Sequence, residues 1–265
     1  MSDCIDMDLV ANAGVLVRGG GLGLLVDGMH DQDGHPFGRV EADDMARMGR
    51  AEGLFERLDY LLFTHEHPDH FTPDLVAEHL ERRPVKGVFL PAPASEPEGR
   101  GRLIRALEKR GVPHWIMGPE PGDTLSVSPE PGLTVTAIGT RHMGKQFQDV
   151  RNDCLLVSLA GMNLLFTGDA DHLPEFYEKA LEGVTLDAAF VNPIFYHNPN
   201  GQIIIDHIFL PREAVIYHMP VQGRDPFHLA FTVKRALERY ARPDMPVHVL
   251  DVNAPRVTLC PALNG

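Results

Sequence analysis

One short segment of the chain gathers four residues whose side chains commonly bind metal ions. They are spaced as H-x-H-x-D-H within T-H-E-H-P-D-H-F and are His65, His67, Asp69 and His70. Alternating residues on an extended turn can aim His65 and His67 at one point, while Asp69 and His70 face a second point beside it. Imidazole and carboxylate groups are the ligands that borderline cations such as Zn²⁺ prefer. The motif therefore predicts a metal site.

The composition and the surroundings of the motif both favour a site over a chance cluster. The chain holds 14 His among 265 residues, and random placement of its His and Asp would give only about 0.003 copies of this pattern. An unbroken apolar run at 60–63 predicts a buried strand before the motif, and Pro73 is expected to begin a helix after it, with Thr72 as N-cap. The alternative is a group of surface histidines on a loop.

The elements that must position this motif are short strands mixed with helices. Apolar runs bounded by Gly, Pro, Asn and Asp predict strands at 9–17, 22–26, 60–63, 88–90, 115–117, 133–138, 155–159, 164–166, 188–191, 215–217, 247–250 and 257–259. Helices are expected up to about residue 57 and at about 73–82, 100–110, 174–182 and 227–241. The Pro/Gly-rich segment 91–101 reads as a surface loop, so residues 1–265 are predicted to form a single α+β domain of two sheets with helices outside.

Charge and hydropathy disfavour two classes of partner. Acidic residues outnumber basic ones by 37 to 24, which gives a formal net charge of -13. A surface of that sign repels phosphate backbones and anionic lipids, so neither nucleic acid nor a membrane is expected as a partner. No apolar run approaches the roughly 20 residues that a membrane-spanning helix needs. A small-molecule substrate is expected instead, and the sequence leaves homo-oligomerisation open.

The cysteines and the first residues point to the cytoplasm. Three cysteines, at positions 4, 154 and 260, are too few and too scattered for a disulfide framework. They suit a reducing compartment, with Cys154 as a small buried hydrophobic residue. The opening M-S-D-C-I-D-M-D is acidic and lacks the pattern of a signal peptide.

With these features the chain resembles the metallo-β-lactamase-fold superfamily of metal-dependent hydrolases. The resemblance lies in T-H-E-H-P-D-H and in the ordered signals after it, and it spans nearly the whole chain. It implies a four-layer αβ/βα sandwich of two mixed β-sheets with helices on the outer faces. It also implies two metal sites. The first consists of His65, His67, His142 and Asp169. The second consists of Asp69, His70, Asp169 and His218.

Each of the later ligands implied by the resemblance follows a predicted strand. His142 lies in G-T-R-H-M, Asp169 in L-F-T-G-D and His218 in V-I-Y-H-M-P. His207 is a rival to His218, but it lies in a run that looks helical. Asp27, at the end of the strand L-L-V-D-G, matches an early Asp of the superfamily that supports the motif loop through hydrogen bonds without binding metal.

The ligand set predicts hydrolysis by a metal-bridged hydroxide. Two divalent cations a few ångströms apart lower the pKa of a shared water from about 15.7 towards 7 and take up the charge that develops in the transition state. Asp69 can both ligate and orient the nucleophile. His67 stands where the oxygen-reducing diiron members usually carry Glu, which favours Zn²⁺, although imidazole also suits Mn²⁺ or Fe²⁺. The alternatives are an iron-dependent oxidoreductase or dioxygenase on the same fold, and a metal-binding module without catalysis.

The substrate is predicted only as a class, a small ester, lactone or phosphodiester. Chain length and V-I-Y-H-M-P resemble the compact branch related to ascorbate-6-phosphate lactonase and small phosphodiesterases, and Asp169 stands where several β-lactamases carry Cys. Three segments are expected to hold substrate, namely 29–50, 192–202 and 219–228. Tyr196 or His197 could donate to an oxyanion or leaving group, and Arg224 could pair with phosphate or carboxylate. Further candidates in these segments are His30, His35, Phe37, Phe195 and His228.

Overall fold

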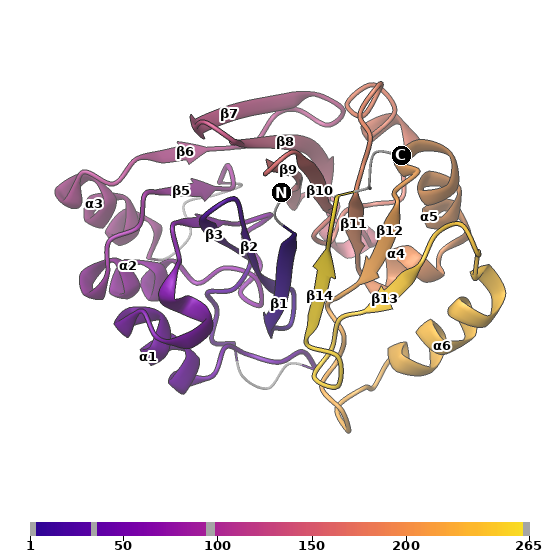
Figure 1. Cartoon of the computed structure of the whole chain (residues 1–265), viewed down its shortest axis with the longest axis horizontal. Helices are drawn as coiled ribbons and strands as arrows, with labels where there is room; N and C mark the ends of the chain where they lie inside the picture. Colours follow the sequence, from indigo (N-terminus) through magenta and orange to yellow (C-terminus); the bar gives the residue numbers. More distant parts are fainter. Residues whose placement is uncertain (1–3, 33–35, 94–98, 262–265) are drawn as a thin grey trace.

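Two β-sheets of seven strands each lie face to face in the computed structural model, which describes residues 4–32, 36–93 and 99–261 (Figure 1). The first sheet has the order β14 (Arg256–Leu259), β1 (Ile5–Ala11), β2 (Gly14–Gly19), β3 (Leu22–Val26), β4 (Tyr60–Leu62), β5 (Gly87–Leu90) and β6 (His114–Ile116). The second has the order β13 (Val247–Val249), β12 (Glu213–Ile216), β11 (Ala188–Val191), β10 (Met162–Phe166), β9 (Arg151–Leu159), β8 (Leu133–Arg141) and β7 (Thr124–Glu130). Both sheets mix parallel with antiparallel pairs.

Helices cover the outer face of each sheet. The first sheet carries α1 (Ala42–Arg50), α2 (Pro73–Arg82) and α3 (Arg100–Arg110), and the second carries α4 (Pro193–His197), α5 (Pro199–Ile204) and α6 (Leu229–Tyr240). Single turns complete the chain as η1 (Gly53–Glu56), η2 (Lys145–Phe147), η3 (Pro174–Phe176) and η4 (Ile205–Phe209). None of the helices in the described ranges is long and apolar enough to cross a membrane.

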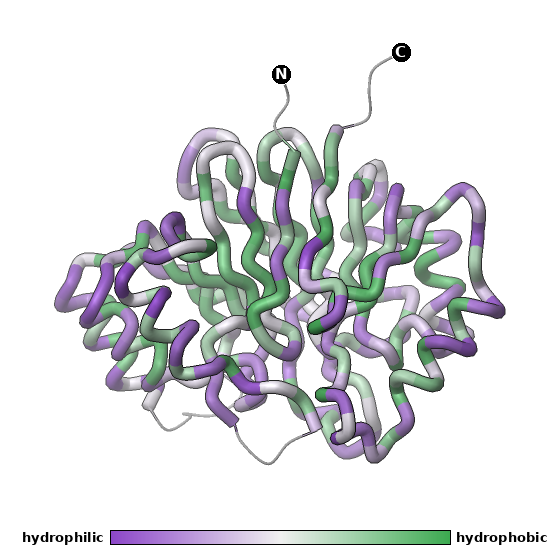
Figure 2. Tube along the Cα trace, turned by 60° about the horizontal axis from the view of Figure 1, so that its bottom comes forward, coloured by the Kyte–Doolittle hydropathy of each residue, from purple (hydrophilic) through white to green (hydrophobic). Residues whose placement is uncertain are grey.

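The alternation of side chains along the strands divides the core into layers. Leu24 faces the space between the two sheets, whereas its neighbour Leu25 faces the helices of the first sheet. In the second sheet Phe190 points between the sheets and Ala189 points towards α4, α5 and α6. Because both faces of these strands are buried, their sequences are continuous apolar runs. Figure 2 shows the hydrophobic strands inside and the more polar helices outside. This arrangement confirms the predicted fold class.

Three of the expectations about secondary structure were wrong. The run 9–17 is two strands, because Asn12 adopts a positive φ of 50° and turns the chain between β1 and β2. Strand β7 was not predicted, since this edge strand is largely exposed and lacks an apolar run. The helix expected at 174–182 is a single 3₁₀ turn, Pro174–Phe176, followed by further turns.

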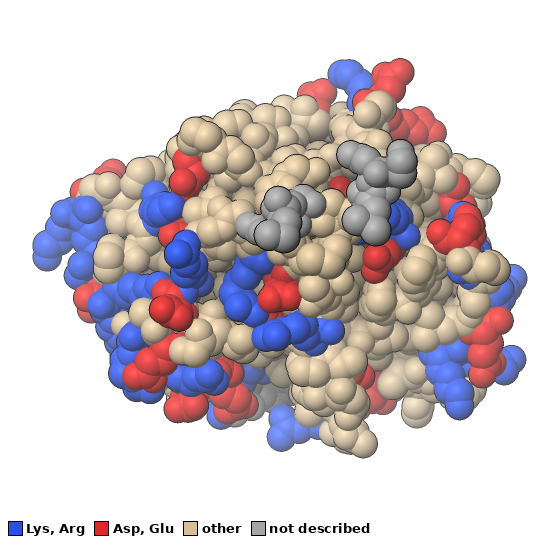
Figure 3. Space-filling model, viewed as in Figure 1, with Lys and Arg blue, Asp and Glu red and all other residues tan. Residues whose placement is uncertain are grey.

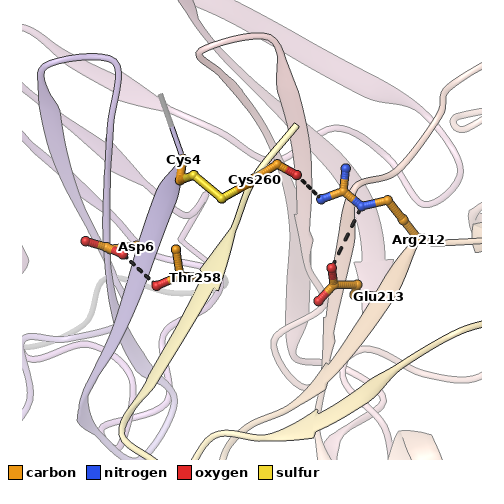
Figure 4. The surroundings of a disulfide bond; sticks show 6 residues. All are labelled: Cys4, Asp6, Arg212, Glu213, Thr258 and Cys260. Atoms are coloured by element: carbon orange, nitrogen blue, oxygen red, sulfur yellow. Dashed lines mark hydrogen bonds and ion pairs between the residues drawn. A yellow bond between two sulfur atoms is a disulfide. The ribbon is translucent and has the colours of Figure 1, made fainter. Parts of the chain in front are cut away.

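A disulfide joins the two ends of the described chain, which corrects the prediction of scattered, unpaired cysteines. Cys4 and Cys260 are bonded across 256 positions of sequence, beside the pair of strands β1 and β14 (Figure 4). Arg212 donates from Nη2 to the carbonyl oxygen of Cys260 at 2.7 Å. Only Cys154 is a free cysteine, and it is buried as predicted. The cysteines therefore no longer favour a reducing compartment.

Basic and acidic side chains are interleaved on the face shown in Figure 3. Elsewhere in the molecule Asp8 accepts hydrogen bonds from two basic residues, Arg18 at 2.8 Å and Arg256 at 2.6 Å. Such pairs engage basic groups that would otherwise be open to a phosphate backbone.

Candidate metal centre

The residues predicted to bind metal lie on loops at one edge of the two sheets. The loop between β4 and α2 carries the H-x-H-x-D-H motif, and the loops after β8, β10 and β12 carry His142, Asp169 and His218. A β-bridge between His142 and Ala170 holds two of these loops together. Four stretches that are far apart in the sequence thus converge on one place.

The ligand-type atoms form two compact groups. The first contains His65, His67, His142 and Asp169. The second contains Asp69, His70 and His218. Within each group the candidate atoms lie within 4.8 Å of one another, so one ion could reach them all. The structure therefore brings together all seven side chains named from the sequence.

The carboxylate of Asp169 lies between the two groups. Its Oδ2 is 3.2 Å from His142 Nε2 and 3.7 Å from His70 Nε2, and its Oδ1 is 3.7 Å from His218 Nε2. The Oδ2 of Asp69 is 3.7 Å from the same His218 nitrogen. This placement suits a carboxylate shared between two cations, as the resemblance implied.

Two imidazole nitrogens in the first group are buried without a hydrogen-bond partner. They are Nε2 of His65 and Nε2 of His142; the His142 ring donates from Nδ1 to the Met143 carbonyl, so its Nε2 faces Asp169 as a lone pair and not as a donor. Burial lowers the pKa of His65 well below its usual 6.5 and lowers that of His67 to about 4. Neutral imidazoles with an unused lone pair are in the state that binds a metal ion. An unpaired buried nitrogen is costly, so these atoms indicate that the group fits a cation.

The second group of ligand-type atoms is surrounded by more negative charge. Burial alone would lower the pKa of His70, but the carboxylates of Asp69, Asp169 and Asp27 outweigh it and raise that pKa well above 6.5. The Nε2 atoms of His70 and His218 are only 3.0 Å apart. A divalent cation would supply the positive charge that these carboxylates require and would replace a proton held between the two rings.

Asp27 holds the motif loop in place through three hydrogen bonds. Its carboxylate accepts from the backbone nitrogen of Thr64 at 2.8 Å and from Thr64 Oγ1 at 2.7 Å, and it lies 3.0 Å from Nδ1 of His70. A carboxylate on Nδ1 directs Nε2 of the same ring towards the cluster. Asp27 is fully buried and is absent from both groups of ligand-type atoms. These contacts suit the supporting role that the sequence suggested for it.

Three asparagines position the acidic residues, and sequence reasoning missed all of them. Asn152 accepts from the backbone nitrogen of Asp169 at 2.9 Å, and Asn192 donates to Asp169 Oδ1 at 3.1 Å. Asn12 donates to the backbone oxygen of Asp69 at 2.7 Å. Their partners lie on other strands or loops, so no local motif reveals them. Each asparagine lies in or next to a strand end, and this position was the one feature of the sequence that could have indicated them.

Gly168 allows the T-G-D turn to approach the motif loop closely. Its φ is 57°, and a Cβ there would lie 2.6 Å from Asn152 Oδ1 and 2.8 Å from Thr64 Oγ1. Any larger residue would push these two supports away. The glycine of L-F-T-G-D is therefore part of the geometry that delivers Asp169.

A cavity of about 570 Å³ opens directly onto both groups of ligand-type atoms. Its lining comes from the metal-site loops and from segments around α4 and α6. The lining residues are Phe37, His67, Asp69, His142, Met143, Gly144, Gln146, Phe147, Asp169, His172, Asn192, Pro193, Ile194, Asn198, His218, Phe227 and Leu229. A small molecule in this cavity would contact the cluster directly.

The three residues proposed from the sequence for substrate or proton contacts do not line this cavity. Tyr196 is fully buried in the core between the second sheet and its helices. His197, next to it on the five-residue helix α4, is exposed and lines a separate hollow against α6. Arg224 lies on an exposed turn and is not among the lining residues. The short helix turns its far end away from the cluster, and this orientation could not be read from sequence.

Of the other residues named in these loops, some line the cavity and others do not. Phe37 lines the cavity. His30 and Phe195 are buried, and His228 is exposed outside the cavity. His35 lies outside the described residues. His207, the rival of His218, is exposed on η4 and belongs to neither group of ligand-type atoms.

Asp153 is a buried carboxylate behind the motif loop with no hydrogen-bond partner for either oxygen. Burial raises its pKa to about 7. The folded state therefore holds a proton that the unfolded chain releases near pH 4, and stability must fall as the pH rises from about 4 to 7. We expect Asp153→Asn to be more stable than the natural chain by about 2–4 kcal/mol at pH 8 and nearly equal at pH 4.

Urea unfolding at both pH values measures this difference. Asp123→Asn, at a side chain that is 63% exposed, is the control and should show no such change with pH. An Asp153→Asn variant that gains nothing between the two pH values would show that the carboxylate is solvated or paired.

The fold and site place the chain in a known family of proteins. The sequence model of the Beta-lactamase superfamily domain matches residues 25–243, and the chain belongs to this superfamily. This confirms the resemblance found in the motif, while the lactonase-like branch within it is not specifically supported. No curated protein matches the chain.

Several solved structures share the fold at low identity. Igni18, a metallo hydrolase from Ignicoccus hospitalis, has a TM-score of 0.60 and 16% identity over 97% of this chain and 99% of its own. An isothiocyanate hydrolase from Delia radicum gut bacteria has a TM-score of 0.60 and 14% identity over 96% and 98%. CmlA, a diiron β-hydroxylase from Streptomyces venezuelae, has a TM-score of 0.57 and 21% identity over 97% of this chain and 54% of its own. The fold thus serves both hydrolytic and oxidative chemistry.

Proposed function

We propose that the protein is a hydrolase that uses two divalent metal ions, most readily Zn²⁺, to cleave a small ester, lactone or phosphodiester. The observation that carries the proposal is the pair of ligand groups with Asp169 between them, at the floor of a cavity. The first ion would be held by His65, His67, His142 and Asp169. The second would be held by Asp69, His70, His218 and the same Asp169.

The chemistry of this site needs no nucleophilic side chain. Two cations bound there would lower the pKa of a coordinated water towards neutrality and would take up the negative charge of the transition state. The chain orients the ligands, since His142 Nδ1 lies 2.6 Å from the Met143 carbonyl and Asn192 fixes Asp169. Asp69 lines the cavity, and in this proposal its carboxylate would orient the attacking water and accept its proton.

A diiron oxidoreductase is the second candidate, because CmlA shares the fold. The proposed set of ligands consists of five histidines and two aspartates, Asp69 and the shared Asp169. With His67 rather than Glu in the motif, this imidazole-rich set favours zinc. Metal analysis separates the two candidates.

The test combines metal content with hydrolysis. Protein purified and loaded with Zn²⁺ should hold two ions per chain, be colourless, and hydrolyse at least one of p-nitrophenyl acetate, a γ-lactone and bis(p-nitrophenyl) phosphate. A chelator should remove the activity and added Zn²⁺ should restore it. Tightly bound iron with a visible absorption band would favour the oxidoreductase. Full zinc loading without hydrolysis of any probe would indicate that the protein is a metal-binding module without catalysis.

A further inference from the structure

The wall of the cavity above the ligand groups is mainly apolar. It is formed by the side chains of Phe37, Met143, Phe147, Ile194, Phe227 and Leu229. Among the described residues that line the cavity there is no Lys or Arg. The remaining wall contacts outside the ligand groups include the neutral amides of Gln146, Asn192 and Asn198. A molecule that binds here would therefore pass from water into contact with apolar side chains and neutral amide groups.

Aromatic rings bring this apolar surface right up to the ligands on both sides. Phe37 lies edge-on to His218 with ring centroids 4.1 Å apart. Phe147 lies 5.0 Å from His67 and 4.8 Å from His142. A reacting group seated over the ligands would thus have a hydrophobic neighbour at either end.

One further wall residue is a histidine whose unpartnered nitrogen is hidden from the cavity. His172 is 8% exposed and lines the cavity, and its Nε2 is buried without a partner. Phe195 packs beside its ring at 4.9 Å. Because Nε2 is closed off from the cavity, the ring meets an occupant with its other atoms and adds no open hydrogen-bonding group there.

Resting on the proposed hydrolytic function, we propose that the substrate is an uncharged carboxylic ester or lactone that carries an apolar chain. Its carbonyl would face the ligand groups and its chain would lie against Phe37, Phe147 and Phe227. Water adds to the acyl carbon, the bond from that carbon to the alcohol oxygen breaks, and the alcohol takes up one proton from the water. A phosphodiester has a permanent charge, and apart from the two ions themselves none of the described wall residues offers a cation to compensate its desolvation.

The chain-length dependence of ester hydrolysis tests this proposal. On the zinc-loaded protein, kcat/KM for p-nitrophenyl octanoate should exceed that for the acetate by at least about 30-fold, because each buried methylene is worth about fourfold and burial of two to three of the extra methylenes suffices. Both esters should exceed bis(p-nitrophenyl) phosphate. Calorimetric binding of 2-decanone, an uncharged ketone that cannot be hydrolysed, should be tighter than that of 2-pentanone. This second readout does not depend on turnover.

Two matched variants locate the effect in the cavity wall. Phe227 and Phe231 are each 65% exposed, but only Phe227 lines the cavity. Phe227→Ala should reduce the preference for octanoate over acetate by about tenfold, while Phe231→Ala should leave it unchanged. If the octanoate ester is hydrolysed no better than the acetate ester, or if the phosphodiester is preferred, the proposed substrate is wrong but the proposed hydrolytic function is not affected. Loaded protein that hydrolyses none of the probes would overturn both.

Discussion

Replacing Asp169 with asparagine should lower kcat/KM for the best hydrolysable probe on the order of 10³-fold and reduce the bound metal below two ions per chain. Burial would raise the pKa of this carboxyl, but His218, His142 and His70 keep it well below its usual range, so Asp169 is ionised. The amide has nearly the same shape but no charge. It therefore removes the negative group that would be shared by both cations, at the centre of a cluster of imidazoles.

Metal content per chain, measured by elemental mass spectrometry, and the hydrolysis rate should fall together. Circular dichroism should remain unchanged, which separates loss of the ions from loss of the fold. Asp123→Asn, at an exposed aspartate paired with Lys179, is the matched control and should retain both metal and activity. If Asp169→Asn kept two ions and ordinary turnover, the shared-carboxylate site would have to be abandoned.

Removing the disulfide should lower the free energy of unfolding by about 2–5 kcal/mol. The bond closes a loop with a sequence separation of 256, so its loss frees almost the entire unfolded chain. The double variant Cys4→Ser, Cys260→Ser should therefore unfold at lower urea concentration. Its metal content and hydrolysis should be unchanged, because neither cysteine belongs to the ligand groups or lines the cavity.

Reduction provides the control for this second prediction. Dithiothreitol should lower the stability of the natural chain to that of the double variant and leave the variant itself unaffected. Thiol titration in denaturant should find one thiol, Cys154, before reduction and three afterwards. Three thiols before reduction would show that the bond does not form.

The sequence was most informative where the chemistry is local. The four motif residues lie within six positions, so their spacing alone indicated a site. Asp169 and His218 were identified through the resemblance to the superfamily, and they meet because the parallel strands β10, β11 and β12 end at one sheet edge. Asn152 and Asn192 could not be found, since each acts through a hydrogen bond to a residue 17 or 23 positions away.

The incorrect expectations also have physical causes. Tyr196 and His197 lie in the correct segment, but a five-residue helix directs one into the core and the other to the outer surface. The pairing of Cys4 with Cys260 depends on β14 returning beside β1, which no short-range pattern encodes. Side-chain direction and long-range strand pairing are properties of the whole fold rather than of a segment.

The position of β14 has a consequence for biosynthesis. This strand completes the sheet whose other strands lie between Ile5 and Ile116, with Ile5 opposite Leu259. During translation the outer edge of β1 must therefore stay open until β14 has also left the ribosome. An open strand edge can recruit other nascent chains, so the growing chain is a natural client for chaperones until β14 pairs with β1.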